Sequence, residues 1–260
     1  MICEPKDKKI FADLMMILMR KVRKGCPISE LVLEAGKYFI GAAYAASTLG
    51  HLPESLVINL REFDCFTLVE NATVLALTAL SGRTDFLHYA KTLQSFRYRS
   101  SNIDGYHSRL HYFTDWIHEA ARQGILYDLT RTLGGQCFRK KIHYMTSNRE
   151  RYPGLEDDDS YHIMRKIEKR ISRRIRYMIT GEQLPSVLDE IADGDIIAIL
   201  TDRDGLDCQH VGLAIHCRGR LRLLHASSEE DSVVITDQSL SAYLAAHDGR
   251  TGILIARMVG

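Results

Sequence analysis

The order of two kinds of apolar pattern constrains the fold of this chain most strongly. Helix-type spacing fills the first part of the sequence, and after Gly194 strand-type patterns follow one another closely. The β-branched or alternating runs lie at 195–201, 209–217, 221–227, 233–236 and 253–258, with a helix-type stretch at 238–246. Helices followed by neighbouring strands predict an α+β fold in which helices pack on an antiparallel sheet.

Four helices are expected in the first part of the chain. Apolar residues from Ile10 to Val22 recur at helical spacing, and Ser29 is placed to cap a second helix. The segment from Cys65 to Leu80 is apolar almost all round, which predicts a buried central helix. A further helix is expected near 85–96. The central helix is therefore the element around which the others should pack.

Length, composition and charge narrow the possible classes of protein. The 260 residues are 45% apolar and 26% charged, with a formal net charge of +1. This apolar content excludes a disordered chain, and the near-neutral total gives no electrostatic reason to expect nucleic acid as a partner. We predict a single domain over 1–260, in which a core at 29–96 and 190–260 is interrupted by a mixed insertion at 97–189.

Neither a membrane span nor an export signal is visible in the sequence. The longest early apolar run, 14–19, is far shorter than the roughly 20 residues that cross a bilayer. No small-residue cleavage site follows it. We therefore interpret this run as part of an amphipathic helix.

The predicted insertion begins with polar residues and contains a strongly basic helix. Arg97-Tyr98-Arg99 suggests a polar loop, and Ile163, Ile167, Ile171 and Ile175 form a helical apolar stripe. Between residues 165 and 176 there are seven basic residues, and Glu168 is the single acidic one. We expect a solvated basic face over a buried stripe, with attraction of an anionic substrate as the alternative. The absence of interleaved aromatic residues disfavours nucleic acid.

One of the six cysteines stands apart from the others. None forms a C-x-x-C pair or a zinc-finger spacing, so most are expected to be free thiols, as in a reducing compartment. Cys65 follows a loop and begins the buried helix, with Asp64 as a natural N-cap. The free N–H groups of a first helical turn favour a thiolate and can stabilise an oxyanion. Cys65 is thus a candidate nucleophile, the alternative being a small residue that fills a helix start.

Two histidines are predicted to lie together on a β-hairpin. A turn at Arg218-Gly219 pairs Cys217 with Arg220, which makes His210 and His225 diagonal neighbours on one face. Small residues on that face, Gly212 and Ala214, leave room for another element. A nucleophilic cysteine needs a base and a group that orients it, so the residues predict a Cys65–His210–His225 constellation.

Two rival interpretations involve Cys208. With His210 and His225 it could bind zinc, but no fourth ligand has a convincing spacing. As a nucleophile it is disfavoured because it begins no helix. We therefore expect no metal.

Several ordered motifs carry a resemblance to a known family. They are Gly41-Ala42-Ala43-Tyr44, Phe63-Asp64-Cys65-Phe66-Thr67-Leu68-Val69-Glu70, Arg97-Tyr98-Arg99, Ser108-Arg109-Leu110-His111-Tyr112-Phe113-Thr114-Asp115-Trp116, Gly194-Asp195-Ile196-Ile197, His210-Val211-Gly212-Leu213-Ala214-Ile215 and His225-Ala226-Ser227-Ser228. Over residues 36–258 the chain resembles the N-acetylmuramoyl-L-alanine amidase-like subfamily of the NlpC-type papain-like cysteine hydrolases, which act on bacterial cell-wall peptides. The resemblance implies a papain-like, NlpC-type core.

The resemblance also implies roles for individual residues. Cys65 would be the nucleophile, His210 the general base and His225 the residue that orients it. Tyr44 would lie beside the thiol and contact substrate. The family's usual proline before this tyrosine is Ala43 here, which leaves the backbone φ angle unfixed. The further substrate-binding residues are predicted to be Asp64, Arg109, His111, Tyr112 and Ser227, with Arg109 suited to a bidentate grip on a carboxylate.

The implied activity is hydrolysis of the amide between N-acetylmuramic acid and L-alanine in muropeptides, without metal or cofactor. Peptidoglycan fragments would be the partners, and the cell envelope or periplasm the location, although no export signal is visible. Two alternatives stay open. One is a γ-D-glutamyl endopeptidase acting on the same stem peptides, and the other is a non-catalytic cell-wall-binding module.

Overall fold

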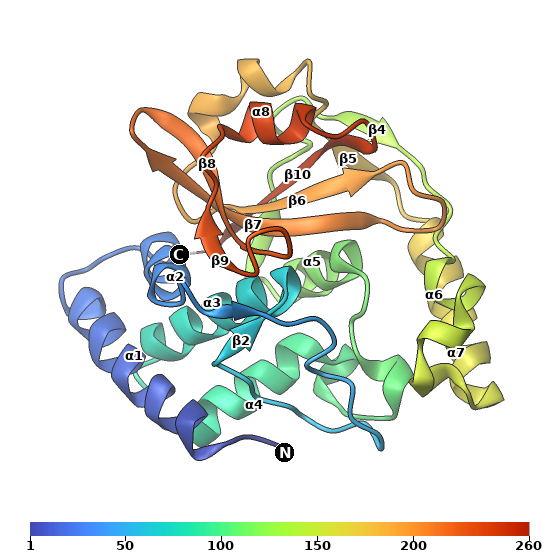
Figure 1. The fold of residues 1–260 in the computed structure, drawn as a ribbon, viewed down its shortest axis with the longest axis horizontal. Helices are drawn as coiled ribbons and strands as arrows, with labels where there is room; N and C mark the ends of the chain where they lie inside the picture. Colours follow the sequence, from blue (N-terminus) through green and yellow to red (C-terminus); the bar gives the residue numbers. More distant parts are fainter. Residues whose placement is uncertain (260) are drawn as a thin grey trace.

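The computed structural model describes residues 1–259 and has an α+β architecture, as predicted (Figure 1). The helices are α1 Pro5–Arg23, α2 Ile28–Tyr38, α3 Cys65–Leu80, α4 Phe86–Arg97, α5 Phe113–Arg122, α6 Tyr144–Ser147, α7 Asp158–Ser172 and α8 Leu240–Ala245. The strands are β1 Ala43–Tyr44, β2 Glu62–Phe63, β3 Leu126–Asp128, β4 Gln136–Phe138, β5 Arg176–Met178, β6 Ile196–Thr201, β7 Cys208–Cys217, β8 Arg220–Ser227, β9 Ser232–Ile235 and β10 Arg250–Met258. Short 3₁₀ turns join several of these elements.

One curled sheet of eight strands, in the order β2-β1-β9-β8-β7-β6-β10-β3, separates two layers of helices. The strand pairs from β9 to β3 are antiparallel, as predicted, and only β1 and β2 pair in parallel. Helices α1 to α5 lie on one side of the sheet, and α8 lies on the other (Figure 1). A separate two-stranded sheet joins β4 to β5.

Helix α3 is the central element, and its predicted limits are confirmed. The Asp64 carboxylate accepts a hydrogen bond from the Thr67 N–H at 2.7 Å, and the Thr67 hydroxyl accepts one from the Asp64 N–H at 3.0 Å. This reciprocal capping box fixes where the helix starts. Most of the helix is buried between α2, α4 and the sheet, in keeping with its nearly all-round apolar sequence.

The hairpin of β7 and β8 has the predicted register, with Cys217 opposite Arg220. Val211, Leu213 and Ile215 pack into the core on the α3 side, whereas Ala214 packs with α8. A β-bulge interrupts the pairing of β6 with β7 between the Ile199–His210 and Leu200–Cys208 pairs. Because a bulge shifts the alternation of side chains, Cys208 packs toward the α3 side while His210 shares the face of Ile199.

Three expectations about local structure are wrong. Helix α2 begins at Ile28 after Pro27, so Ser29 lies within its first turn and does not cap it. Arg97 and Tyr98 are not in a polar loop but are only 2% and 1% exposed, because Arg97 ends α4 and pairs with Glu70. Ile175 is 53% exposed, since α7 ends at Ser172, before the stripe does.

Residues 97–189 contribute to two different parts of the fold. Strand β3 pairs with β10, and the buried Trp116 of α5 joins the main core. Helices α6 and α7 instead build a smaller apolar cluster with Tyr112. This cluster places the 106–112 segment between the main core and α7.

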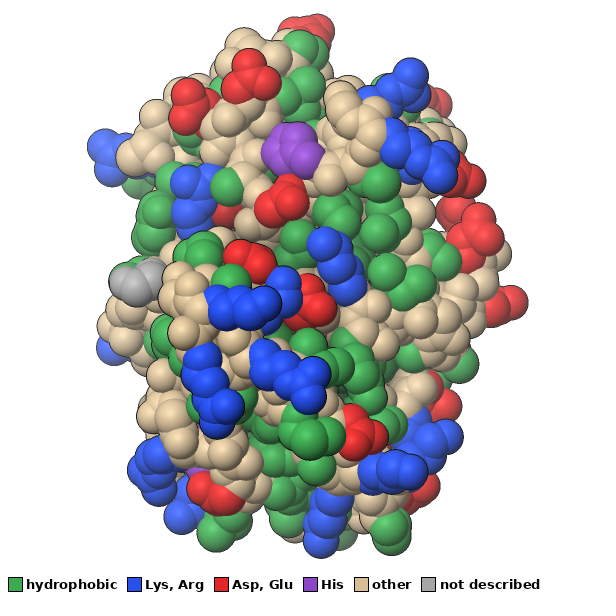
Figure 2. Space-filling view, turned by 90° about the vertical axis from the view of Figure 1, so that its left-hand side faces the viewer, with side chains coloured by type: hydrophobic (Ala, Val, Ile, Leu, Met, Phe, Trp, Pro, Cys, Tyr) green, Lys and Arg blue, Asp and Glu red, His purple; other side chains and the backbone are tan. Residues whose placement is uncertain are grey.

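Charge is dispersed on the outer face next to α1 and α2. Figure 2 shows Lys and Arg side chains interspersed with Asp and Glu there. Lys21 of α1, for example, pairs with Glu30 at 2.8 Å and with Glu34 at 3.1 Å, both on α2. Within residues 1–259, no helix combines the length and apolar character needed to cross a bilayer.

Candidate active site

Cys65 occupies the first position of α3, directly after the Asp64 cap. Its surroundings raise the pKa of the thiol to about 12, because burial and the Asp64 carboxylate outweigh the nearby backbone groups of Val211 and Phe66. The backbone groups at the helix start do lower this pKa, as expected, but burial and Asp64 outweigh them. The side chain is a neutral thiol until a base removes its proton.

His210 and His225 form a hydrogen-bonded pair, with His210 Nε2 2.6 Å from His225 Nδ1. The two rings are perpendicular, with centroids 4.7 Å apart. If His210 carries its proton on Nε2, it donates this hydrogen bond to His225. The other ring nitrogen, Nδ1, is then free to accept a proton. The predicted proximity of the two histidines is confirmed.

Both histidines are electrically neutral at neutral pH. Burial lowers the pKa of His210 to about 3, with the neighbouring His225 and Arg250 adding to the shift. Burial, followed by Arg250, lowers the pKa of His225 to about 4. A neutral imidazole is what a general base requires.

Cys65 and His210 line the same cavity of about 160 Å³. Gln209 and Cys208 also contribute to its wall. Within residues 1–259, no hydrogen bond joins the Cys65 thiol to either imidazole. The cavity is thus lined by a thiol and an imidazole, both in their neutral forms.

A larger cavity of about 450 Å³ adjoins the first one, and the two share Phe66, His111 and Tyr152 as lining residues. Arg109 and Asp64 contribute polar groups to the larger cavity. Pockets that combine apolar walls with a few convergent polar groups are typical ligand sites. The two cavities together form a cleft that leads from Cys65 to Arg109.

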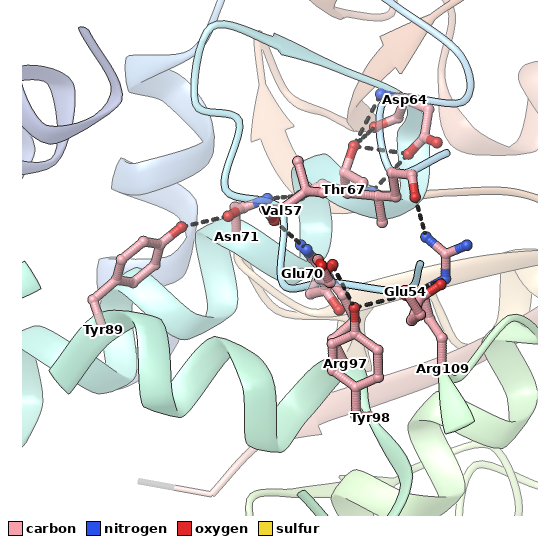
Figure 3. Close-up of polar contacts among 12 residues, drawn as sticks. Glu54, Val57, Asp64, Thr67, Glu70, Asn71, Tyr89, Arg97, Tyr98 and Arg109 are labelled. Carbon is pink, nitrogen blue, oxygen red and sulfur yellow. Dashed lines mark hydrogen bonds and ion pairs between the residues drawn. The ribbon is translucent and has the colours of Figure 1, made fainter. Parts of the chain in front are cut away.

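Arg109 and His111 are both held in place at the larger cavity. The Arg109 Nη1 donates to the Leu49 carbonyl at 2.8 Å, and its Nε lies 3.5 Å from Glu54 (Figure 3). Its guanidinium also stacks on Tyr106. His111 Nε2 lies 2.8 Å from the Tyr106 carbonyl, to which it donates. Burial, together with Arg109, holds the pKa of His111 well below its usual range, so its Nδ1 is a free acceptor.

A buried polar network supports the start of α3 from below (Figure 3). Arg97 donates to Glu70 from Nε at 2.8 Å and from Nη2 at 2.6 Å, and it also donates to the Val57 carbonyl. The Tyr98 hydroxyl donates to Glu54 at 2.7 Å, which links this network to Arg109. The network fixes α3 relative to α4 and to the cavity wall.

The other predicted substrate-binding residues lie in different settings. Tyr44 is partly buried, and burial raises the pKa of its hydroxyl, with Cys65 and Asp64 adding to the shift. The Tyr112 hydroxyl donates to Glu168 at 2.7 Å and accepts from the Met145 N–H at 3.0 Å. Its hydrogen-bonding capacity is therefore used within the protein.

Ser227 is likewise committed to local structure. Its hydroxyl oxygen accepts from the N–H groups of Glu229 and Glu230, both at 3.2 Å. Ser227 therefore closes the turn between β8 and β9, next to the strand β1 that carries Tyr44.

Sequence reasoning missed two residues beside the histidines, Tyr243 and Arg250. The Tyr243 ring centroid lies 5.5 Å from that of His225 and 6.1 Å from that of His210. The Arg250 guanidinium lies over the same tyrosine ring, 4.0 Å from its centroid. The available signal was the small residue Ala214, which leaves room for an approaching element; that element is α8.

No metal centre is apparent at the rival cysteine. Among residues 1–259, no group of three or more His, Cys, Asp or Glu side chains is arranged to hold a metal ion. The Cys208 Sγ instead lies 3.0 Å from the His210 carbonyl oxygen.

Comparison with known protein families shows which family this chain belongs to. Residues 34–253 match the family described as AmiA-like, N-acetylmuramoyl-L-alanine amidase-like. The chain belongs to this family. A search of the curated proteins finds no match.

Solved structures also resemble this amidase-like chain. A crystal structure of an N-acetylmuramoyl-L-alanine amidase from Bacteroides uniformis is 38% identical with a TM-score of 0.85, covering 90% of this chain and 99% of that one. A Bacteroides fragilis protein described as a candidate xylanase is 40% identical with a TM-score of 0.83, covering 87% and 100%. LPG0564 from Legionella pneumophila, at 19% identity and a TM-score of 0.71 over 96% and 94%, shares the fold.

Proposed function

We propose that this protein is a cysteine amidohydrolase that cleaves the amide between N-acetylmuramic acid and L-alanine in muropeptides. Membership of the amidase-like family supports the reaction class. The observation that carries the mechanism is His210, which lies 2.6 Å from His225 and lines the same cavity as Cys65 at the start of α3. We further propose that the core is papain-like and NlpC-type, with 97–189 as its insertion.

The first half of the reaction forms a thioester. His210 Nδ1 accepts the Cys65 proton as the sulfur attacks the lactyl carbonyl carbon of the muramic acid. Free N–H groups of the first turn of α3 stabilise the oxyanion. His210 then returns the proton to the nitrogen of L-alanine, the C–N bond breaks, and the stem peptide leaves with a free amino group.

The second half releases the sugar. His210 takes a proton from water as the water oxygen attacks the thioester carbonyl, and the proton returns to the departing Cys65 sulfur. His225 accepts from His210 Nε2–H throughout and so keeps Nδ1 directed at the reacting atoms, as the third member of a triad does. Neither half needs a redox partner.

The cleft supplies the proposed substrate contacts. Arg109 lies in the wall of the larger cavity, where its guanidinium can donate to a substrate oxygen, and His111 Nδ1 can accept from one. Asp64 and Tyr44 flank the thiol. A peptidoglycan substrate places the protein in the cell envelope or periplasm, which is part of the proposal.

Glycoside hydrolysis, suggested by the description of one related structure, fits the cleft less well. Glycosidases need two carboxyl groups that act on opposite sides of the scissile bond. The carboxylates at the larger cavity are occupied, since Asp64 caps α3 and Glu70 pairs with Arg97. The amidase is therefore the function that the geometry favours.

The nucleophile assignment is tested by comparing two cysteines of one cavity. We expect Cys65→Ala to abolish release of stem peptide from purified muropeptides, because no other thiol stands at a helix start. Cys208→Ala should retain most of the turnover, as measured by chromatography of the digest. Turnover that survives in Cys65→Ala, or is lost only in Cys208→Ala, overturns the mechanism. Binding without any turnover in the wild type would favour a wall-binding module.

A further inference from the structure

Tyr243 and Arg250 form a wall behind the histidine pair. Tyr243 lies on α8 and contacts both imidazoles, and its ring is inclined to that of His225 by 68°. Arg250, at the start of β10, places its guanidinium carbon 4.0 Å from the centroid of the tyrosine ring. The Tyr243 ring thus lies between the Arg250 guanidinium and the imidazoles. A cation over the face of an aromatic ring is attracted to it.

Arg250 carries a positive charge that no carboxylate neutralises nearby. Its Nη1 donates to the Tyr243 carbonyl oxygen, and its Nε is buried without a hydrogen-bond partner. Within residues 1–259 it forms no ion pair with Asp or Glu. A fixed cation beside two imidazoles makes it costly for either of them to gain a proton, because like charges repel more strongly at a site shielded from water.

The groups around the pair leave Arg250 as the dominant fixed charge. Glu229, whose charge acts on Tyr243, is 73% exposed and lies 3.8 Å from His247. Tyr243 is itself uncharged at neutral pH, since burial raises the pKa of its hydroxyl. The titratable and charged groups facing the pair are Cys65 and Asp64 from α3, Cys208 from β7, Tyr243 from α8, Arg250 from β10, Glu229 after β8, and His247 after α8.

We propose that Arg250, through the ring of Tyr243, is a positioning residue that keeps the His210–His225 pair uncharged and in its hydrogen-bonded geometry. A protonated His210 cannot take the proton of Cys65, so the charge of Arg250 extends to lower pH the range in which the base stays neutral. This role of Arg250 rests on the proposed function in one respect, namely that His210 is the base of the proposed reaction. The pKa of each histidine is lowered partly by Arg250, which agrees with the geometry.

The test is a histidine titration followed by nuclear magnetic resonance on the full chain, with His210 and His225 assigned from His→Gln variants. Arg250→Gln should raise both midpoints by about one pH unit, whereas Arg250→Lys should leave them close to wild type because it keeps the charge. Tyr243→Leu removes the ring and should also move the midpoints. It provides a second variant if Arg250→Gln does not fold.

A matched control lies on the same strand. Arg257 pairs with Asp195 at 2.7 Å, away from the histidines, so Arg257→Gln should lower the melting temperature without moving the midpoints. Midpoints that are unchanged in folded Arg250→Gln, or that move equally in Arg257→Gln, overturn the proposal.

The fall of muropeptide turnover at acidic pH distinguishes a failure of this proposal from a failure of the proposed amidase function. In Arg250→Gln, the pH at which turnover falls should rise together with the histidine midpoints. Midpoints that move in a protein without turnover support the role of Arg250 and contradict the amidase. If Arg250→Gln turns over muropeptides but its histidine midpoints are unchanged, only the role of Arg250 is contradicted.

Discussion

At the scale of single residues, burial outweighs helix position in setting the protonation of the site. Cys65 stands where free N–H groups favour a thiolate, yet burial raises its pKa to about 12. The same burial lowers the pKa of His210 to about 3. The resting site therefore consists of a neutral thiol and a neutral imidazole.

The neutral histidines predict a pH dependence of stability. The unfolded chain binds a proton at each histidine near pH 6.5, but folded His225 resists until about pH 4. Between these values the unfolded state binds more protons, so the free energy of unfolding falls as the pH drops from about 6.5 to about 4. His225→Gln removes this contribution.

Urea unfolding of wild type and His225→Gln at pH 7 and pH 4.5 measures the contribution of His225 to the free energy of unfolding. The stability advantage of the wild type should shrink at the lower pH by on the order of 2 kcal/mol. An advantage that is equal at the two pH values contradicts a neutral, buried His225.

At the scale of elements, the buried ion pair of Glu70 and Arg97 joins α3 to α4. Both side chains are 3% exposed, and their oxygen and nitrogen lie 2.6 Å apart. Removing only the cation leaves Glu70 charged without a partner inside the protein. Burial raises the pKa of this carboxyl against the opposing effect of Arg97, which shows how costly its charge is there.

Arg97→Met should therefore lower the free energy of unfolding by about 3–5 kcal/mol. The double variant Glu70→Gln/Arg97→Met should recover part of that loss, because it removes both charges. Arg122→Met is the control, since Arg122 is 66% exposed where it pairs with Glu119 and should cost less than about 1 kcal/mol. Chemical denaturation checks all three, and equal losses in Arg97→Met and Arg122→Met contradict a buried pair.

Elements defined by local signals could be predicted from the sequence, and those defined by distant partners could not. The limits of α3 follow from the Asp64 cap and an apolar run, and the register of β7 with β8 follows from a two-residue turn. Arg97 was misplaced because its partner Glu70 lies 27 positions away. A polar residue that is paired inside the protein has the same sequence signature as one in a loop.

At the scale of the whole molecule, the cleft is assembled from three distant parts of the chain. The thiol comes from α3, the histidines come from the β7–β8 hairpin, and the wall of the larger cavity comes from the 106–111 segment. The sequence predicts the chemistry of each part. Which part faces which depends on the curl of the sheet and on the bulge before His210, and this explains why the approach of α8 to the histidines was missed.

The bond that is cut tests the central claim most directly. A purified disaccharide–peptide muropeptide is incubated with the wild-type protein, and the products are identified by mass spectrometry, with Cys65→Ala as the blank. The account predicts an intact stem peptide that begins with L-alanine, together with the sugar bearing a free lactyl carboxyl group. Recovery of the sugar still carrying L-alanyl-D-glutamate, together with the remainder of the stem peptide, would show a γ-D-glutamyl endopeptidase and contradict it.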